Sequence, residues 1–226
     1  MNARQITVVI PAKNEARSLA GVLKKVRKYA AEIIVVDGKS SDGSHEIAKK
    51  LADKVIVDAG RGKGLAMRSA IRHISNKITV FMDADGSHNP ADIPILVKPI
   101  VENKADHVSG SRLLGGSGEF HGSFNECFRL MGSSFITAVI NHRFGVRISD
   151  SQNGFRAIKT DVLKKLDLRE KITTIEQEMI IKTLKNNYRI VDVPTFEARR
   201  KYGNSCVKLS RVSFRYIYTL IKYCYL

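Results

Sequence analysis

The chain has 226 residues and a formal net charge of +16 at pH 7, from 38 Lys and Arg against 22 Asp and Glu. That length suits one α/β domain with a sizeable core. The charge favours an anionic partner, which could be nucleic acid, a membrane surface or a phosphorylated substrate. The three cysteines, Cys127, Cys206 and Cys224, have neither metal-site spacing nor an even count, which predicts a reducing compartment. Residues 1–5 lead directly into a strand, so no signal peptide is expected.

The first half of the chain alternates short apolar runs with amphipathic stretches. The apolar runs predict four strands, at residues 5–10, 32–36, 54–57 and 78–82. Helical spacing of apolar residues predicts three helices between them, at residues 16–30, 44–51 and 65–74. Such alternation predicts an α/β fold with a mostly parallel central sheet and helices on both faces.

Two carboxylates, Asp83 and Asp85, follow the fourth strand directly. Open α/β sheets bind ligands at this edge, and hard divalent cations take oxygen ligands. Taken alone, the pair is equally consistent with a solvated turn. However, Glu15 and Asp37 follow the first and second strands, so four acids should converge. Their convergence in a basic protein favours a site for a cation and a phosphate.

The second half is predicted to contain further helices at residues 92–102, 125–141 and 173–185, and strands at 106–110 and 189–193. The glycine-rich segment 115–118 is either a loop that closes over substrate or an ordinary turn.

Residues 207–226 form a basic stripe and an apolar face when they are placed on a helix. The stripe consists of Lys208, Arg211, Arg215 and Lys222. The opposite face consists of Leu209, Phe214, Ile217, Leu220 and Ile221, with tyrosines at its flanks. This pattern predicts an amphipathic helix in a membrane interface, too charged to span a bilayer. The alternative is a helix docked on the domain with a solvated basic face.

Four motifs occur in order, at residues 11–15, 35–43, 62–66 and 83–85. Together they resemble family 2 glycosyltransferases of the GT-A fold, and most of all the polyprenyl- and dolichyl-phosphate mannosyl or glucosyl synthases. The resemblance covers nearly the whole chain. It implies a GT-A catalytic domain at residues 1–206, followed by the amphipathic, membrane-interfacial helix at 207–226.

The resemblance implies roles on the side of the sugar donor. It assigns contacts with the nucleotide to Pro11, Lys13, Glu15, Asp37, Asp83 and Ala84. Asp85 would bind Mg²⁺ or Mn²⁺, with Ser87 as a further ligand, and Arg200 and Lys208 would neutralise the diphosphate. The chain departs from the mannosyl synthases at three positions. Those enzymes have an aromatic residue at Lys13, a metal-binding glutamine at Ser87 and a lysine at Cys206.

On the acceptor side, the resemblance assigns a phosphate to Arg112 and Arg129. Asp150 would orient or deprotonate the acceptor, with a structural turn as the alternative. The expected catalytic set is therefore Asp150, Asp85 and Arg112. Glu178 aligns with a family glutamate that faces the site, and Glu176 is expected at the surface.

These expectations describe a metal-dependent, inverting transfer of a hexose from GDP-mannose or UDP-glucose to polyprenyl or dolichyl phosphate. The protein would be cytoplasmic and peripheral on the inner face of the membrane. One alternative is the same fold acting on a soluble or polysaccharide acceptor, and another is a silent nucleotide-sugar-binding module. A nucleic-acid-binding domain would explain the charge but not the clustered acids, so no nucleic acid partner is expected. The base, sugar, metal and lipid remain open.

Overall fold

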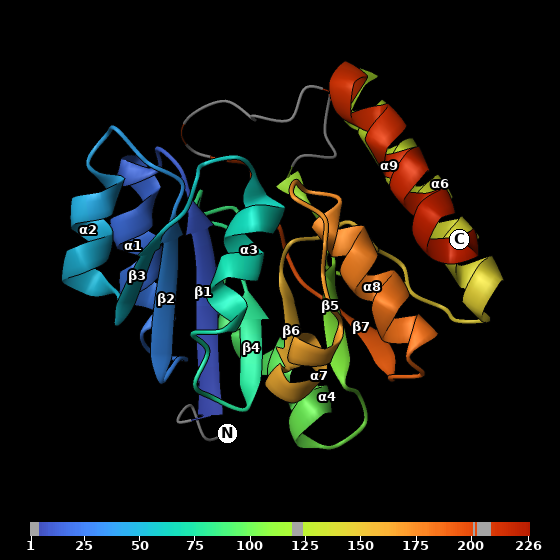
Figure 1. Ribbon diagram of the computed structural model, residues 1–226, viewed down its shortest axis with the longest axis horizontal. Coiled ribbons are helices and arrows are strands. Elements are labelled where there is room, and N and C mark those ends of the chain that lie inside the picture. Colours follow the sequence, from blue (N-terminus) through green and yellow to red (C-terminus); the bar gives the residue numbers. More distant parts are fainter. Residues whose placement is uncertain (1–4, 119–123, 201, 203–208) are drawn as a thin grey trace.

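The computed structural model describes residues 5–118, 124–200, 202 and 209–226. They form a seven-stranded sheet in the order β3-β2-β1-β4-β6-β5-β7 (Figure 1). The strands are β1 (Ile6–Ala12), β2 (Glu32–Asp37), β3 (Lys54–Val57), β4 (Ile78–Phe81), β5 (His107–Ser111), β6 (Arg156–Lys159) and β7 (Ile190–Pro194). Strand β6 runs antiparallel to both of its neighbours, and the other pairs are parallel. The predicted mostly parallel sheet is therefore confirmed.

The order of the first four strands places the functional loops side by side. Strand β1 lies between β2 and β4, with Ala12 opposite Asp37 and Val9 opposite Phe81. All three strands are parallel, so their carboxyl ends meet at one edge, the upper edge of the sheet in Figure 1. The loops that carry Glu15, Asp37 and Asp85 leave from this edge, as the sequence predicts.

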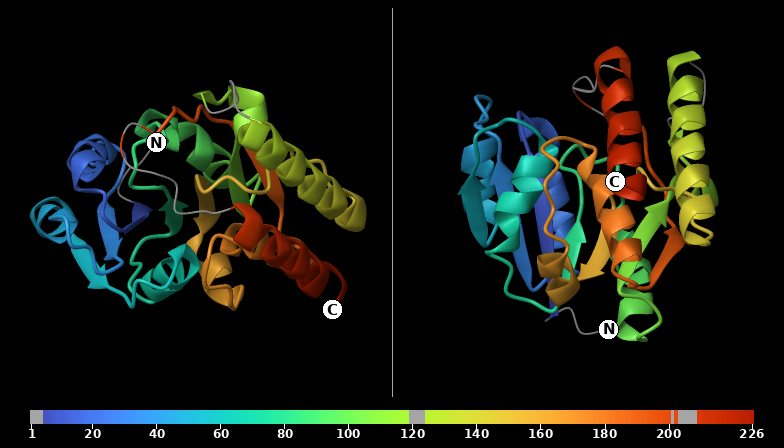
Figure 2. Two further views of the ribbon diagram at one scale, coloured as in Figure 1. Left: turned by 90° about the horizontal axis from the view of Figure 1, so that it is seen from above. Right: turned by 45° about the vertical axis from the view of Figure 1, so that its right-hand side comes forward.

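Helices cover both faces of the sheet (Figure 2). One face packs against α1 (Ala16–Val26), α2 (Ser44–Leu51) and α4 (Ile93–Val101), which follows the 3₁₀ turn η2 (Pro90–Asp92). The other face packs against α3 (Lys63–Ile71), α7 (Thr160–Lys165) and α8 (Ile175–Lys185). Alternate residues of β1 supply the two cores, since Val8 belongs to the first and Val9 to the second.

Two long helices, α6 (Phe124–Phe144) and α9 (Leu209–Tyr225), lie side by side beyond the β7 end of the sheet (Figures 1 and 2). They share a third apolar cluster with α8, in which Ile140, Ile180 and Leu220 are buried. Among the described residues, no helix has the length and apolar character needed to cross a bilayer.

Only part of the apolar face predicted for α9 is buried against the rest of the protein. Leu220 is buried against the domain, but Phe214, Ile217 and Ile221 remain exposed. Tyr223, expected at a flank, is buried instead. The helix therefore docks by a narrow side and leaves apolar side chains on its outer surface. Its predicted basic residues Lys208 and Arg211 lie outside the part whose side chains are described.

The main omission in the sequence prediction is β6. Its four residues include only two apolar ones, Ala157 and Ile158, and it begins with the buried Arg156. So short a run has no clear period, and its place between β4 and β5 depends on long-range pairing. The short helices α5 (Arg112–Gly115) and α7 were also not predicted.

Candidate active site

The first two loops of the carboxyl edge are bonded to each other. The backbone N–H of Asn14 donates to Ser40 Oγ at 2.9 Å, and Asn14 Oδ1 accepts from the Ser41 N–H at 2.9 Å. Asn14 adopts a positive φ of 57°, which asparagine tolerates better than most residues. This turn places Lys13, whose Nζ donates to the Gly60 carbonyl at 3.0 Å, beside the loop after β3.

Asp37 ends β2 and is almost fully buried at this junction. Its Oδ1 accepts from the Ser40 N–H at 3.1 Å, and its Oδ2 lies 3.1 Å from His45 Nδ1. The predicted nucleotide residues Lys13 and Asp37 therefore flank the same pair of loops.

Glu15 and Asp85 meet at Arg200. The Arg200 guanidinium forms an ion pair with Glu15, and its Nε lies 3.9 Å from Asp85 Oδ2. Burial is the largest influence on the Glu15 carboxyl and raises its pKa above the ordinary value, although Arg200 opposes this. The structure thus brings together three predicted donor-side residues from opposite ends of the chain.

The Asp85 carboxylate is held in position from one side. Ser87 donates to Asp85 Oδ1 from its backbone N–H at 3.0 Å and from its hydroxyl at 2.7 Å. Ser87 itself is 3% exposed. Its hydroxyl therefore positions Asp85, and its role as a second metal ligand stays a prediction.

These residues fit a divalent cation that is shared with a substrate. Carboxylate and hydroxyl oxygens are the donors that Mg²⁺ and Mn²⁺ select. Within the described ranges, no group of three or more His, Cys, Asp or Glu converges to form an all-protein cage. Mg²⁺ commonly takes one or two carboxylates and fills its shell with phosphates and water. Asp85 supplies the carboxylate that such a site requires.

Asp83 belongs to a separate ion-pair network that the sequence prediction missed. Lys63 Nζ, from the first turn of α3, lies 2.5 Å from Asp83 Oδ1 and 2.8 Å from Glu176 Oε1. Burial acts to raise the pKa of Asp83, but Lys63, with smaller effects of His88 and Arg200, outweighs it and lowers the pKa. The motif at residues 62–66 could have pointed to Lys63, because it places a lysine next to this sheet edge.

Neither glutamate of α8 lies where it was expected, and both are buried. Glu176, predicted at the surface, is 3% exposed and pairs with Lys63. Glu178, predicted to face the site, accepts from the N–H groups of Arg169 and Glu170 and pairs with Lys182 at 2.8 Å. Both expectations are wrong. Residues two apart on a helix point about 200° apart, so only one of the two can face the site.

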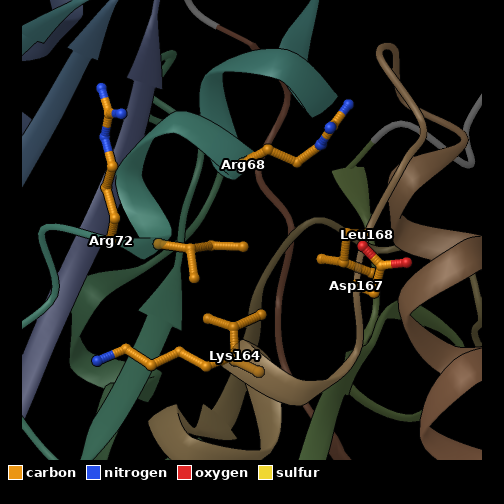
Figure 3. A pocket seen from close by; sticks show the side chains of 7 residues that line it. Arg68, Arg72, Lys164, Asp167 and Leu168 are labelled. Atoms are coloured by element: carbon orange, nitrogen blue, oxygen red, sulfur yellow. The ribbon is translucent and has the colours of Figure 1, made fainter.

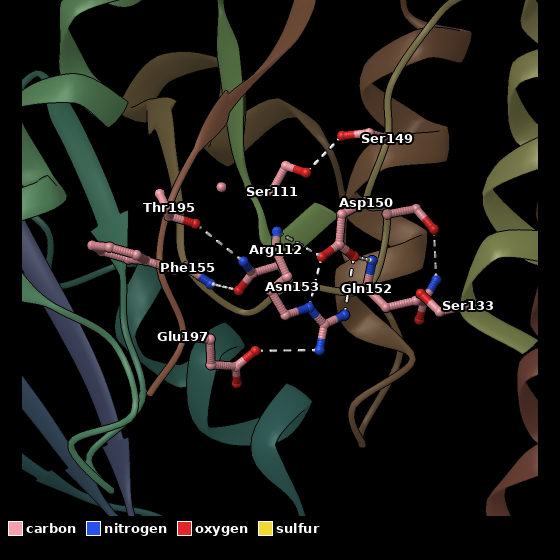
Figure 4. Close-up of polar contacts among 12 residues, drawn as sticks. Ser111, Arg112, Ser133, Ser149, Asp150, Gln152, Asn153, Phe155, Thr195 and Glu197 are labelled. Carbon is pink, nitrogen blue, oxygen red and sulfur yellow. Dashed lines mark hydrogen bonds and ion pairs between the residues drawn. The ribbon is translucent and has the colours of Figure 1, made fainter. Parts of the chain in front are cut away.

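Arg112 and Asp150 form the centre of the predicted acceptor side (Figure 4). The guanidinium donates to both carboxylate oxygens, from Nε at 2.7 Å and from Nη2 at 3.0 Å. Burial acts to raise the pKa of Asp150, but the Arg112 charge outweighs it and holds the pKa below its ordinary value. Both Asp150 oxygens are engaged by Arg112, and this pairing makes the carboxylate a weaker base, so the geometry favours positioning over proton abstraction. The third guanidinium nitrogen, Nη1, lies 3.4 Å from Glu197 Oε2.

The turn that carries Asp150 is supported from two sides. Ser151 Oγ lies 2.8 Å from Thr137 Oγ1 on α6. Behind the turn, the fully buried Arg156 donates to the carbonyls of Asn153 and of Glu176, the latter at 2.9 Å. The Arg156 guanidinium thus ties the acceptor side to the Lys63 network.

The remaining predicted residues are placed as follows. Pro11 lies within β1, one residue beyond its predicted end, and Ala84 is buried between the two aspartates. The Arg129 side chain and the whole of Lys208 lie outside the described part of the chain. The roles given to all these residues stay predictions.

A cavity of about 390 Å³ lies elsewhere, between the C-terminal half of α3 and the end of α7 (Figure 3). Its lining includes Arg68, Arg72, Lys164 and Asp167, and none of the predicted site residues.

Comparisons with known proteins agree with this geometry. The profile of glycosyl transferase family 2 matches residues 7–167. An uncharacterized protein of Methanocaldococcus jannaschii is 30% identical, covering 98% of this chain and 93% of its own. The UDP-N-acetylglucosamine–dolichyl-phosphate N-acetylglucosaminyltransferase of Methanococcus voltae is 28% identical, covering 98% of this chain and 96% of its own.

Among solved structures, the glucosyl-3-phosphoglycerate synthase of Mycobacterium tuberculosis with Mn²⁺, UDP-glucose and phosphoglyceric acid has a TM-score of 0.78 at 22% identity. That match covers 98% of this chain and 80% of the synthase. Another structure of the same synthase contains Mg²⁺ and UDP. This chain belongs to glycosyl transferase family 2, and it is a nucleotide-sugar glycosyltransferase with the GT-A fold.

Proposed function

We propose that this enzyme transfers a hexose or N-acetylhexosamine from a nucleoside-diphosphate sugar to a polyprenyl or dolichyl phosphate. The observation that carries the lipid acceptor is a set of exposed apolar side chains on α5 and α6, the two helices next to the Arg112–Asp150 pair. On α5, Arg112 is followed at once by Leu113 and Leu114, which are 47% and 56% exposed. On α6, Met131 and Phe135 are 64% and 58% exposed. Thr137 of that helix is bonded to the Asp150 turn, so α6 lies next to the pair, and Met131 and Phe135 point outward from the helix to solvent.

An acceptor with a phosphate head and an isoprenoid tail matches both parts of this surface. Arginine suits the phosphate because its guanidinium is always charged and donates in a fork. Exposed apolar side chains on α5 and α6 would contact the tail, which a soluble sugar acceptor does not need. The relative from Methanococcus voltae, whose name includes dolichyl phosphate, supports this acceptor class.

The exposed apolar residues of α9 favour attachment to a membrane surface. Phe214, Tyr218 and Ile221 are 79%, 55% and 49% exposed on a helix that packs beside α6. Amphipathic helices bind interfaces through buried apolar area and through attraction between basic residues and anionic lipids. The net charge of +16 provides that attraction. We place the enzyme on the cytoplasmic face of the membrane as a peripheral protein.

For the donor we propose a UDP-linked sugar, because the name of the relative from Methanococcus voltae includes UDP-N-acetylglucosamine. Lys13 and Asp37 would line the nucleotide, and Arg200 would face the diphosphate. A Mg²⁺ or Mn²⁺ ion on Asp85, when bound, would act as a Lewis acid that stabilises the charge of the leaving diphosphate. The surrounding residues fix this carboxylate through Ser87.

The reaction would be a single displacement that inverts the anomeric carbon. An acceptor phosphate oxygen forms the new bond to that carbon, and the bond to the diphosphate oxygen breaks. The phosphate oxygen is already ionised near neutral pH, so no strong base is required. Asp150 would orient the acceptor through Arg112, in keeping with its lowered pKa.

The test incubates purified protein with radiolabelled UDP-glucose, UDP-N-acetylglucosamine or GDP-mannose, short polyprenyl phosphates, and Mg²⁺ or Mn²⁺. We expect label from one donor to enter the organic phase, in a product with the opposite anomeric configuration. Asp85→Ala should abolish metal-dependent donor binding, and Asp161→Ala, an exposed carboxylate on α7, should not. Label that stays in water with a bound donor would refute the lipid acceptor and point to a soluble one. Turnover retained by Asp85→Ala would refute the metal site.

A further inference from the structure

Glu197 lies where three segments of the site meet. It follows β7, and its backbone bonds the glycine-rich loop, donating to the Gly116 carbonyl at 3.2 Å and accepting from the Gly118 N–H at 2.8 Å. The next residue, Ala198, donates to the Ser87 carbonyl at 2.8 Å. The backbone at Glu197 is therefore held between the glycine-rich loop and the loop that carries Asp85.

The Glu197 carboxylate is poorly satisfied for its degree of burial. Its side chain is 15% exposed. Oε2 lies 3.4 Å from Arg112 Nη1, and Oε1 lies 4.0 Å from His88 Nε2. Within the described chain, Oε2 is buried and makes no hydrogen bond of acceptable geometry. By contrast, Asp150 takes the two short bonds of the same guanidinium.

An unsatisfied buried oxygen of this kind calls for a reason. Buried polar atoms in native proteins are nearly always hydrogen-bonded, and a carboxylate can accept about four hydrogen bonds. Each exception needs an explanation, such as a catalytic role or a bound group that supplies the missing donor. The hydroxyl groups of a sugar are such donors.

Glu197 connects the donor-side loop with the acceptor side. In a single displacement the sugar ring lies between the leaving diphosphate and the attacking oxygen. The bond from Ala198 to Ser87 attaches the chain next to Glu197 to the loop of Asp85, and Asp85 lies 3.9 Å from Arg200 Nε. The Glu197 carboxylate itself contacts Arg112 of the acceptor side (Figure 4).

We propose that Glu197 is a specificity-determining residue that accepts hydrogen bonds from hydroxyl groups of the transferred sugar. The charges of Arg112, Asp150 and Glu197 sum to −1, so the site would favour a neutral sugar and disfavour a uronic acid. This inference rests on the proposed nucleotide-sugar donor. It does not depend on the lipid acceptor.

The experiment compares the wild type with Glu197→Gln and Glu197→Ala by calorimetric binding in Mn²⁺. The ligands are UDP-glucose, UDP-N-acetylglucosamine, GDP-mannose, UDP-glucuronic acid, and free UDP and GDP. We expect each Glu197 variant to lose roughly tenfold in affinity for the neutral sugar nucleotide that the wild type binds, with little change for the matching free diphosphate. Glu197→Gln should also reduce the ratio of the affinity for that neutral sugar nucleotide to the affinity for UDP-glucuronic acid. The control is Glu102→Gln, which changes an exposed carboxylate at the end of α4. It should alter neither the affinity for the neutral sugar nucleotide nor the preference over UDP-glucuronic acid.

The possible failures are distinguishable. An unchanged ratio of sugar-nucleotide to diphosphate affinity in folded variants would overturn the role of Glu197 and leave the proposed function intact. The transfer assay with polyprenyl phosphate provides a second check on the same variants. A change confined to the KM for the acceptor in that assay would overturn the role of Glu197 as well, because Glu197 would then act by holding Arg112. If the wild type binds none of the sugar nucleotides, both the donor assignment and the role of Glu197 fail. Unchanged thermal unfolding midpoints establish that the variants are folded.

Discussion

Replacing Lys63 by Met should remove about 3 kcal/mol from the free energy of unfolding. Lys63 Nζ serves two carboxylates, Asp83 at 2.5 Å and Glu176 at 2.8 Å. Removing one partner of a buried ion pair costs about 3–5 kcal/mol, because an unpaired charge stays behind. The Glu176 side chain is only 4% exposed, but the Asp83 side chain keeps 31% of its surface in water. We therefore take the lower end of that range, a large fraction of the roughly 5–15 kcal/mol of a typical domain.

The assay is equilibrium unfolding in urea at neutral pH. The double variant Lys63→Met/Glu176→Gln should recover at least half of the loss, because the more buried of the two carboxylates is then neutral. Lys104→Met is the control, since this lysine is 72% exposed in a surface pair and its loss should leave the midpoint unchanged. A loss below about 1 kcal/mol, or no recovery in the double variant, would refute the network as described.

Two further predictions concern stability. Burial acts to raise the pKa of the Asp106 carboxyl, but Lys159 and Arg189 outweigh it and lower the pKa to about 2. The ionised carboxylate therefore stabilises the folded state fully above pH of about 4, and this stabilisation disappears as the pH falls to about 2. Asp106→Asn should thus lower the free energy of unfolding by about 2 kcal/mol at pH 7 and by progressively less in acid. Asp167→Asn removes one partner of a fully exposed pair that solvent screens, so it should show a much smaller pH dependence of the same sign. Gly64→Ala should cost about 1–3 kcal/mol, because its Cβ would lie 2.6–2.8 Å from the backbone of residues 170–172. Gly21→Ala, with open space around its Cβ on α1, should instead gain about 0.5–1 kcal/mol, and equal effects of the two changes in thermal unfolding would contradict the packing described here.

Local pattern was sufficient to predict the first half of the fold and the donor-side loops. Strands β1, β2 and β4 are short apolar runs, and the alternation with helices forces them to be parallel. Parallel strands have their carboxyl ends at one edge, so Glu15 and Asp85 had to lie near each other. The resemblance of the motifs to the family then predicted the chemistry of that edge.

The sequence could not say which partner each charged side chain would find. Lys63 reaches Asp83 and Glu176 only because α3 and α8 cover the same face of the sheet. The turn of α8 that brings Glu176 to the site sends Glu178 to the 169–170 backbone. Helical period gives the angle between two residues, and only the docking of the helix decides which of them faces inward.

The same division applies to the surfaces. The sequence by itself determined that α9 is amphipathic and that the chain is basic. Only the tertiary structure decided that Leu220 packs against α8 and that Phe214 and Ile221 stay exposed, because burial depends on the neighbouring helix. Glu197 shows this most clearly, since its contacts with Arg112 and His88 join segments far apart in the chain. Composition and period describe one segment at a time, but a site forms where segments with no local relation are packed together.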